Sequence, residues 1–274
     1  MFQIFQYEFM QNAFIVGILL WLIGPILWVF LIIRRYTMIS DTLSHTSLTW
    51  VILWLISGYS PIIVTLFYTV FSALIIEKLR QTKKLAWDMV LSLMLALNLG
   101  IVATAMSLNS KVLLNISSYL FWSIALVSRQ DVYLLLWLAI FIIIIFFFIW
   151  NSLLKVTYDE DNAEVSWINV KFINIIFIIL VAMLITLAIP ITWVLLLSAL
   201  IIIPVIASTQ ISWSFKSTII IAEIISVLSV ITWIILSYYY DISASWMITF
   251  LLIWFFCLFF FYNKINKQKF YKNI

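Results

Sequence analysis

Apolar segments of about 20 residues recur from one end of this 274-residue chain to the other, and a helix needs about that length to cross the hydrocarbon core of a bilayer. Hydrophobic residues make up 66% of the chain and charged residues only 9%. No polar stretch is long enough to fold as a soluble domain. The sequence therefore predicts an all-α polytopic membrane protein in which residues 1–274 form a single transmembrane domain.

Hydrophobic runs and turn residues divide the chain into a single bundle of eight to nine membrane-spanning helices, and nine is the favoured number. Segment 112–127 is short and polar, which favours an interfacial or re-entrant piece on the outer side over a further crossing. Cys257 lies in the last apolar run, where we expect a small buried hydrophobe. The nine helices are expected at 12–33, 37–57, 61–79, 88–108, 132–154, 172–190, 191–210, 217–239 and 244–262.

The basic residues predict how the bundle is inserted. If the N-terminus lies outside and nine helices cross, the C-terminus is cytosolic, and of the 15 Lys and Arg residues only Lys111 and Arg129 fall outside. Such an excess of basic residues is typical of cytosolic loops. Because these charges occupy connecting segments and the C-terminus, they indicate orientation, and nucleic acid is not expected as a partner.

An acid and the only histidine of the chain stand four residues apart in the second predicted helix. At this spacing Asp41 and His45 share one helix face, flanked by Ser44 and Thr46. An ionised carboxylate facing lipid costs at least about 2.5–3.5 kcal/mol, so an intramembrane Asp normally faces the bundle or an aqueous path. One interpretation is half of a divalent-metal site, which a two-fold dimer would complete with two oxygens and two nitrogens. The other is an Asp–His hydrogen bond near a helix start, where Asp41 offsets the helix dipole.

Three further polar residues within predicted spans are candidates for a specific role. Glu223 stands about two turns into the eighth helix, where a structural role or a place along an ion path is expected. Asn98 and Ser107 of the fourth helix are expected to form interhelical hydrogen bonds.

The longest polar connection on the cytosolic side, near 156–171, is acidic where basic residues would be favoured. A short amphipathic helix that docks on a cytosolic partner is one explanation, and an ordinary solvated loop is the other. The pattern leaves both open. The acids of this segment are Asp159, Glu160, Asp161 and Glu164.

Residue usage argues against catalysis by this chain. Its four glycines, at 17, 24, 58 and 100, cannot form the glycine-rich loop that cradles nucleotide phosphates. Its single histidine cannot supply the two-histidine signature of a zinc protease. We therefore expect no enzyme activity and no ATP hydrolysis by this chain alone.

Five blocks of the sequence follow one another over essentially the whole chain. In GPILWVFLIIRRYTMISDTLSHTSL (24–48) an arginine pair precedes Asp-x-x-x-His. The others are SYLFWSIALVSRQDVYLL (118–135), VTYDEDNAEVSW (156–167), VLLLSALIIIPVIAS (194–208) and LSYYYDISASW (236–246). In this order the five blocks, the first of them most specifically, resemble the permease subunit of binding-protein-dependent ABC importers for zinc, manganese or iron.

This resemblance implies that Asp41 and His45 are the metal ligands of the permeation path. Ser44, Thr46 and Glu223 are then candidates for positions near the ligands or along that path. The resemblance also implies that 157–168 contributes the cytosolic helix touching an ATPase. The matching positions in that block are Asp159, Glu160, Ala163 and Glu164.

The same resemblance implies partners and a location. They are a separate cytosolic ABC ATPase, an extracytoplasmic metal-binding protein and a second copy of the chain in a homodimer, in the cytoplasmic membrane of a bacterium. The transported ion is zinc or manganese, with iron as a further option, because an Asp and a His suit several divalent metals. No covalently bound cofactor is expected.

Two other functions fit parts of the sequence. A secondary transporter driven by protons or sodium would use Asp41 and Glu223 as titrating groups. A non-transporting membrane scaffold would use Asp41 and His45 only structurally, so that both would be replaceable.

Fourteen tryptophans against four glycines is an unusual balance for helices that must pack closely. Nine of the tryptophans stand where the family that this chain resembles commonly has glycine. A UGA codon read as glycine by the organism but translated as tryptophan would produce this pattern; genuine tryptophan, partly in interfacial belts, is the alternative. UGG codons at these positions would rule the reassignment out. The positions are Trp21, Trp28, Trp50, Trp54, Trp122, Trp167, Trp193, Trp233 and Trp246.

Overall fold

The computed structural model describes residues 8–57, 61–82, 86–108, 129–188, 194–240, 250–261 and 263. Within these ranges all regular structure is helical. The helices are α1 (Glu8–Ile33), α2 (Met38–Ser57), α3 (Pro61–Gln81), α4 (Trp87–Leu108), α6 (Arg129–Tyr158), α7 (Glu160–Val165), α8 (Val170–Ala188), α9 (Val194–Thr209), α10 (Phe215–Tyr240) and a shorter apolar helix at Phe250–Phe261.

Each of the nine predicted ranges overlaps one of these helices, and the all-α prediction is confirmed for the part of the chain described. Five helices contain segments long and apolar enough to cross a membrane, namely those of α1, α3, α4, α6 and α8. Helix α2 is not among these five, which were identified from the described residues only. Segment 112–127, with its predicted interfacial position, lies outside the described residues.

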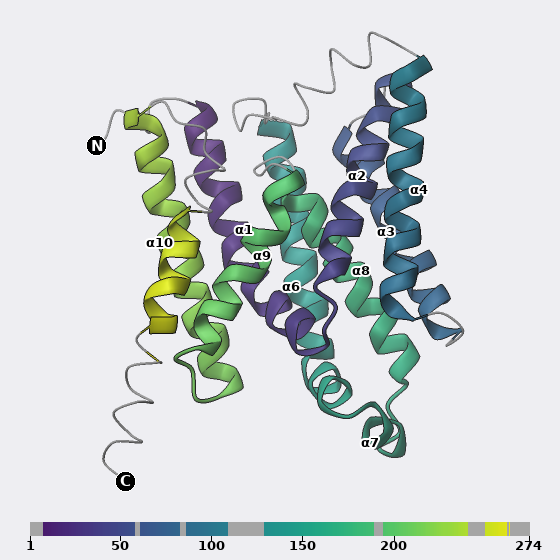
Figure 1. Cartoon of the computed structure of the whole chain (residues 1–274), viewed down its shortest axis with the longest axis vertical. Helices are drawn as coiled ribbons and strands as arrows, with labels where there is room; N and C mark the ends of the chain where they lie inside the picture. Colours follow the sequence, from purple (N-terminus) through teal and green to yellow (C-terminus); the bar gives the residue numbers. More distant parts are fainter. Residues whose placement is uncertain are drawn as a thin grey trace.

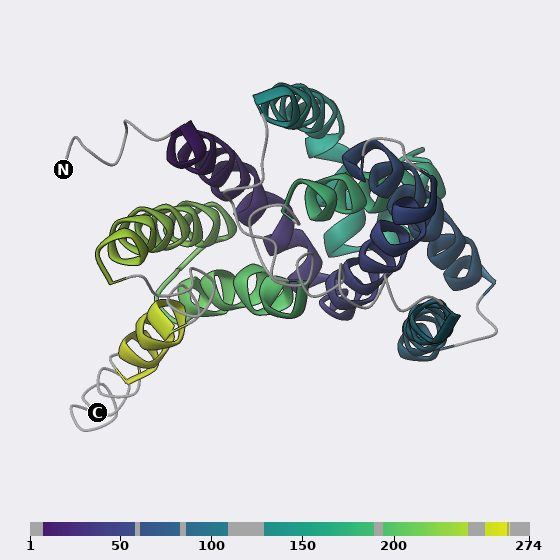
Figure 2. The same ribbon diagram turned by 90° about the horizontal axis from the view of Figure 1, so that it is seen from above.

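Helices α1 and α8 form the centre of the bundle. The apolar windows of both are two-thirds buried, compared with about a fifth for α4. Helix α8 packs against α3, α6, α2 and α1, whereas α1 packs against α10, α6, α9 and α8. Figures 1 and 2 place α10 at one edge of the molecule and α3 and α4 at the opposite edge.

Phe30 of α1 holds the central helices together through aromatic contacts. Its fully buried ring lies edge-on to Phe146 and Trp150 of α6, Phe177 of α8 and Phe215 of α10, with ring centroids 5.1–6.4 Å apart. Large buried rings contribute most of the apolar area in such a core. Cys257, by contrast, is exposed, so the prediction of a buried hydrophobe there is wrong.

One end of the bundle collects the connections that matter for the site. The ends of α1, α3 and α6 and the beginnings of α2, α8 and α10 lie at the end that carries α7 (Figure 1). The described basic residues are unequally divided between the two ends of the bundle. All but one lie at or near the helix ends on the α7 side, and Arg129 begins α6 at the other end. The list for the α7 end is Arg34, Arg35, Lys78, Arg80, Lys155, Lys171 and Lys216.

The turn between α1 and α2 is only four residues long and is held by backbone hydrogen bonds. The Arg35 N–H donates to the Ile32 carbonyl at 3.0 Å, and the Tyr36 N–H donates to the Leu31 carbonyl at 2.8 Å. This is the Schellman pattern of helix termination, with Arg35 in the left-handed position at φ 59°. The turn therefore connects the end of α1 to the first turn of α2 with little slack.

Candidate metal site

Asp41 and His45 lie on one face of α2, as their spacing predicts, and both are half-buried. Asp41 is in the first turn of the helix, near the end of the bundle that carries α7. The Nδ1 atom of His45 is buried and has no hydrogen-bond partner among the described residues. A buried imidazole nitrogen without a partner is costly, and it is suited to ligating a cation.

In the part of α2 whose side chains are described, at 38–47, 49 and 50, the buried surface is unusual for a membrane helix because it bears hydroxyls. Each of these side chains is at most 2% exposed, and each hydroxyl donates to a backbone carbonyl three or four residues earlier. Small side chains satisfied in this way let neighbouring helices approach closely. The residues are Ser40, Thr42, Ser44, Thr46, Ser47 and Thr49.

Ser44 and Thr46 belong to this packed surface. The Ser44 hydroxyl donates to the Ser40 carbonyl at 2.6 Å, and the Thr46 hydroxyl donates to the Thr42 carbonyl at 2.8 Å. Thr46 also accepts a hydrogen bond at 2.8 Å from the side-chain amide of Asn98 on α4. The structure thus places both residues in the packing of α2, whereas Asp41 and His45 stay half-exposed.

Of the two interhelical hydrogen bonds predicted for α4, one is confirmed. Buried Asn98 joins α4 to α2 through Thr46. The prediction for Ser107 is wrong: its side chain is exposed and donates to Thr104 within the same helix. An exposed serine satisfies its hydroxyl locally, so sequence position alone did not separate the two cases.

Glu223 lies on α10, half-buried, and α10 packs against α1 and α9. Helix α2 packs instead against α3, α4, α9 and α8. Within one chain, the two helices that carry Glu223 and the Asp41–His45 pair therefore have α9 as a shared neighbour. No group of three or more His, Cys, Asp and Glu side chains suited to a metal ion forms within the described ranges.

The acidic segment after α6 does contain a short helix, so the amphipathic-helix interpretation agrees with the structure in this respect. Asp159 is the N-cap of α7, and its carboxylate accepts hydrogen bonds at 3.0 Å from the backbone N–H groups of Asp161 and Asn162. The bond from the Asn162 N–H is the main cause that lowers the pKa of the Asp159 carboxyl. The negative charge of an Asp at the N-cap also interacts favourably with the helix dipole.

Helix α7 ends in a second Schellman motif. The Trp167 N–H donates to the Glu164 carbonyl at 3.0 Å, and the Ile168 N–H donates to the Ala163 carbonyl at 3.1 Å. Trp167 occupies the left-handed position at φ 60° with its side chain 98% exposed. Glycine normally holds this position because a Cβ atom is strained there.

The two faces of α7 differ in what they contact. Ala163 is 2% exposed and packs against the bundle, and Glu160 accepts a hydrogen bond at 3.2 Å from Asn174 of α8. On the outer face Glu164 and Val165 are exposed, the latter by 80%. The segment therefore presents acids and apolar surface to the surroundings while its inner face is anchored.

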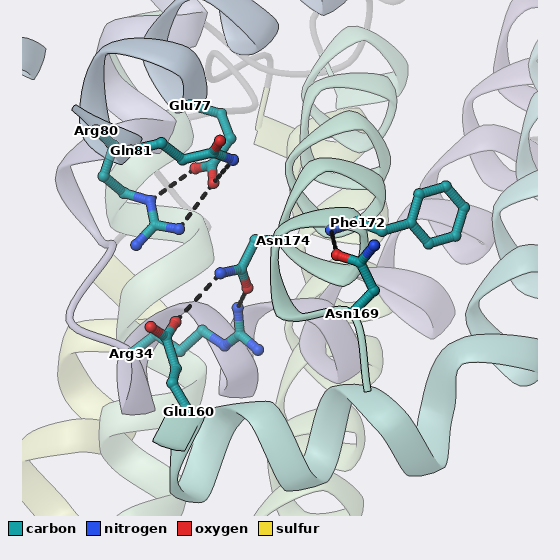
Figure 3. A network of polar contacts seen from close by, with 8 residues as sticks. All are labelled: Arg34, Glu77, Arg80, Gln81, Glu160, Asn169, Phe172 and Asn174. Atoms are coloured by element: carbon teal, nitrogen blue, oxygen red, sulfur yellow. Dashed lines mark hydrogen bonds and ion pairs between the residues drawn. The ribbon is translucent and has the colours of Figure 1, made fainter. Parts of the chain in front are cut away.

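Arg34, the last residue before the left-handed turn of α1, joins three helices through its side chain. Its Nε donates to Thr157 Oγ1 at 2.8 Å. Its Nη1 donates to Asn174 Oδ1 at 2.7 Å (Figure 3). The guanidinium also lies 4.9 Å from the ring centre of Phe177. Burial lowers the pKa of Arg34, but an arginine of this kind stays protonated. Because Asn174 in turn donates to Glu160, the chain of contacts runs from α1 through α8 to α7.

A second polar cluster holds the other side of the same turn. Glu77, at 1% exposed, pairs with Arg80 through two hydrogen bonds of 2.7 Å and accepts a third from Gln81 at 3.0 Å (Figure 3). The Arg80 guanidinium lies over the rings of Tyr36 and Trp87, 5.6 and 6.0 Å from their centroids. The turn between α1 and α2 is thus contacted by α3 and α4 on one side and by α6 and α8 on the other.

Sequence reasoning used Arg80 only as an orientation signal and Arg34 both as an orientation signal and as part of the arginine pair in the family resemblance, and it did not single out Asn174 or Glu77. The available signal was a polar residue within an otherwise apolar helix, the same signal that identified Asn98. It was not enough to find the pairing, because Arg34 and Asn174 are 140 positions apart in the chain.

Several of the tryptophans predicted to replace glycine occupy crowded surroundings. A Cβ atom on Gly24 would lie 2.5 Å from the ring of Trp28, and the buried indole N–H groups of Trp21 and Trp28 have no hydrogen-bond partner in the described part of the chain. The ring of Trp50 stacks on Tyr68 with centroids 3.3 Å apart, below the usual 4.5–7 Å. Three of the predicted positions, Trp122, Trp193 and Trp246, lie outside the described residues, and the side chains of Trp54 and Trp233 are not described.

Comparison with known proteins identifies the family. Residues 6–263 match the model of the ABC 3 transport family. A metal transport system membrane protein of Treponema pallidum (strain Nichols) is 32% identical over 240 residues, which cover 88% of this chain and 90% of that protein. The high-affinity zinc uptake system membrane protein ZnuB of Buchnera aphidicola subsp. Acyrthosiphon pisum (strain APS) is 32% identical over 242 residues, which cover 88% and 92%.

The fold agrees with this assignment. The solved structure of PsaBC from Streptococcus pneumoniae in complex with Fab superposes with a TM-score of 0.80 at 21% identity, over 93% of this chain and 91% of the other. The chain therefore belongs to the ABC 3 transport family and is a multi-pass metal ABC transporter permease of the bacterial cytoplasmic membrane.

Proposed function

We propose that this permease imports a divalent transition metal, zinc or manganese, and that Asp41 and His45 are its ligands in the permeation path. The observation that carries the proposal is the His45 Nδ1 atom, buried without a hydrogen-bond partner in the described structure, on the helix face it shares with Asp41. A carboxylate oxygen and an imidazole nitrogen are ligands that both ions accept. The relative ZnuB is named for zinc uptake, which supports the choice of metal class.

One chain supplies only half of such a site. No suitable group of three or more ligands gathers within the described residues, and zinc sites commonly need three or four protein ligands. A second copy related by a two-fold axis would add another Asp41 and His45, giving two oxygens and two nitrogens. We accordingly propose a homodimer with the ion path at its interface and residues 1–274 as one transmembrane domain.

The cytosolic partner is proposed to be a separate ABC ATPase that docks on the segment near 156–171. The exposed face of α7 carries Glu164 and Val165, while Ala163 and Glu160 attach the inner face to the bundle. Asp159 contributes by capping the helix. We propose that the segment near 156–171 is cytosolic, with the N-terminus outside, the C-terminus cytosolic and about nine crossings.

The proposed cycle begins when an extracytoplasmic binding protein delivers the metal to the outer mouth. Closure of the ATPases on ATP and their subsequent opening shift the permease between two access states. Asp41 and His45 replace part of the ion's hydration in the path, and their binding must be weak enough to release it inward.

The test compares Asp41→Ala and His45→Ala in the permease assembled with its ATPase and binding protein in vesicles. Uptake of zinc and of manganese is measured separately as accumulated metal. Each variant is expected to lose at least about tenfold in uptake of the transported ion, as loss of one ligand interaction of about 1.4 kcal/mol or more predicts.

Asp88→Ala is the matched control, because Asp88 is likewise an acid in the first turn of its helix, but is exposed on α4. It removes the same helix-dipole interaction and should leave uptake unchanged. Wild-type rates for both ligand variants would overturn the ligand assignment, and uptake by the permease without its ATPase would favour ion-coupled transport.

A further inference from the structure

The Arg34 side chain reaches from the turn before α2 to both neighbours of α7. It donates to Thr157, one residue before the end of α6, and to Asn174 on α8. A third donor, Nη2, lies 3.5 Å from the Leu153 carbonyl. Asn174 then donates to Glu160 in the first turn of α7 (Figure 3). One guanidinium therefore contacts acceptors on α6 and α8 and, through Asn174, reaches α7.

The backbone on the other side of Arg34 leads directly to the proposed metal ligands. Arg34 is followed by the left-handed Arg35, and the Tyr36 N–H is bonded to Leu31 at 2.8 Å, so the turn has little freedom to absorb a displacement. Helix α2 begins at Met38, and Asp41 stands in its first turn. Only a short, hydrogen-bonded stretch of backbone therefore separates Arg34 from Asp41.

The opposite side of the turn is held independently. The ring of Tyr36 packs against the ring of Trp87, with centroids 4.6 Å apart, and the Arg80 guanidinium lies over it. Arg80 in turn pairs with the buried carboxylate of Glu77. A relative movement of α7 and α8 against α3 and α4 would therefore act on the turn from both sides, and the start of α2 would have to follow.

We propose that Arg34 is a positioning residue that couples ATPase-driven movement of α7 to the Asp41–His45 face of α2, through hydrogen bonds to Thr157 and to the Asn174–Glu160 relay. This proposal rests on the proposed function, since it assigns the route by which the ATPase reaches the metal site. The planar guanidinium is suited to this task, because its donors reach several acceptors in fixed directions, whereas a lysine offers a single point charge.

The test measures ATP hydrolysis and metal uptake in parallel on the complete transporter in vesicles. Arg34→Gln and Asn174→Leu are expected to reduce metal taken up per ATP hydrolysed by about tenfold, within the roughly 5–150-fold range of typical allosteric coupling. Hydrolysis itself and the amount of assembled complex should stay within about twofold of wild type, because neither residue is on the outer face of α7. Arg34→Lys is expected to show the same loss of metal uptake per ATP, although lysine keeps the positive charge.

Arg35→Gln is the matched control. It makes the same chemical change one residue later, on an exposed side chain. The metal taken up per ATP hydrolysed should therefore equal that of the wild type. The double variant Arg34→Gln with Asn174→Leu should lose no more coupling than Arg34→Gln alone, because Arg34→Gln already breaks the bond to Asn174. Additive losses would overturn the relay through Asn174.

A direct readout uses fluorophores on single cysteines in a Cys257→Ser background, at exposed Val165 of α7 and exposed Met38 of α2. In the otherwise wild-type protein, ATP should change the signal at both Val165→Cys and Met38→Cys. With Arg34→Gln added, the change at position 165 should persist and the change at position 38 should be lost.

Undiminished uptake per ATP in Arg34→Gln and Asn174→Leu, or an ATP response at position 38 that survives Arg34→Gln, would overturn the coupling role. Failure of the proposed function is distinguishable from this, because then the unmodified transporter would not take up metal at all. If Arg34→Gln does not assemble, Asn174→Leu and the Met38→Cys reporter carry the test.

Discussion

Arg35 and Trp167 occupy equivalent positions at the ends of α1 and α7. Both are in the left-handed region, at φ 59° and 60°, and both take part in the hydrogen bonds of a complete Schellman motif. A side chain in this conformation costs roughly 1–2 kcal/mol relative to glycine. The cost at Trp167 is not offset by packing, because the ring is 98% exposed. This position therefore agrees with the hypothesis that a glycine belongs there.

Trp167→Gly is expected to stabilise the permease by roughly 1–2 kcal/mol, because the left-handed strain disappears and almost no buried area is lost. Thermal unfolding of the purified protein in detergent, without its partners, measures the effect as a rise of a few degrees in Tm. Trp213→Gly is the control, since Trp213 is also 98% exposed but is not among the described non-glycine residues with positive φ. It should leave stability unchanged or lower it. Equal shifts in the two variants would contradict the role of backbone strain.

At the level of single helices, α7 is a short helix that is stabilised by its caps and by packing, because its length alone is insufficient. Six residues make a helix too short to be stable in isolation. Here the Asp159 cap, the Schellman end and the buried Ala163 together hold it at the end of α6. The acidic pattern of the segment is thus explained in part by helix capping and in part by an outward face.

The Asp159 cap makes the stability of α7 depend on pH. Its folded pKa is lowered relative to the unfolded chain, so the stabilisation is present above the unfolded pKa of about 3.9 and is lost as pH falls through the folded value. Amide hydrogen exchange of α7, corrected for intrinsic rates, should therefore show loss of protection only below about pH 4.

The variants that check this differ in whether they can still cap. Asp159→Ala is expected to lose protection of α7 at neutral pH, whereas Asp159→Asn should keep protection and lose the dependence on pH, since Asn is also a good N-cap. If Asp159→Ala leaves α7 as protected as in the unmodified chain, the cap does not hold the helix.

Across the whole molecule, the packing order decides which side chains meet. The described basic residues gather at the end that carries α7, with Arg129 at the opposite end, and this division agrees with the predicted cytosolic location of that end. The same end holds the Arg34 contacts, the start of α2 and the acidic face of α7, so the proposed ATPase contact and the proposed metal ligands are connected through one short turn.

Insertion with a cytosolic α7 predicts the accessibility of introduced cysteines. In a Cys257→Ser background, Gln130→Cys at the start of α6 should react with a membrane-impermeant maleimide in intact cells. Val165→Cys should react only after the cells are permeabilised. Both side chains are exposed in the structure, so in cells that lack the ATPase, which would cover Val165, the membrane accounts for the difference. Reaction of Val165→Cys in intact cells would reverse the orientation.

The sequence by itself determined the positions of the helices and the shared face of Asp41 and His45. Hydrocarbon length and the 3.6-residue period are properties of a contiguous segment, so they survive any packing arrangement. Only the tertiary structure decided that Asn98 meets Thr46 while Ser107 stays exposed, and that Arg34 reaches Asn174 and, through it, Glu160. Such contacts join residues far apart in the chain, and their partners are selected by how helices pack against one another, which no local pattern encodes.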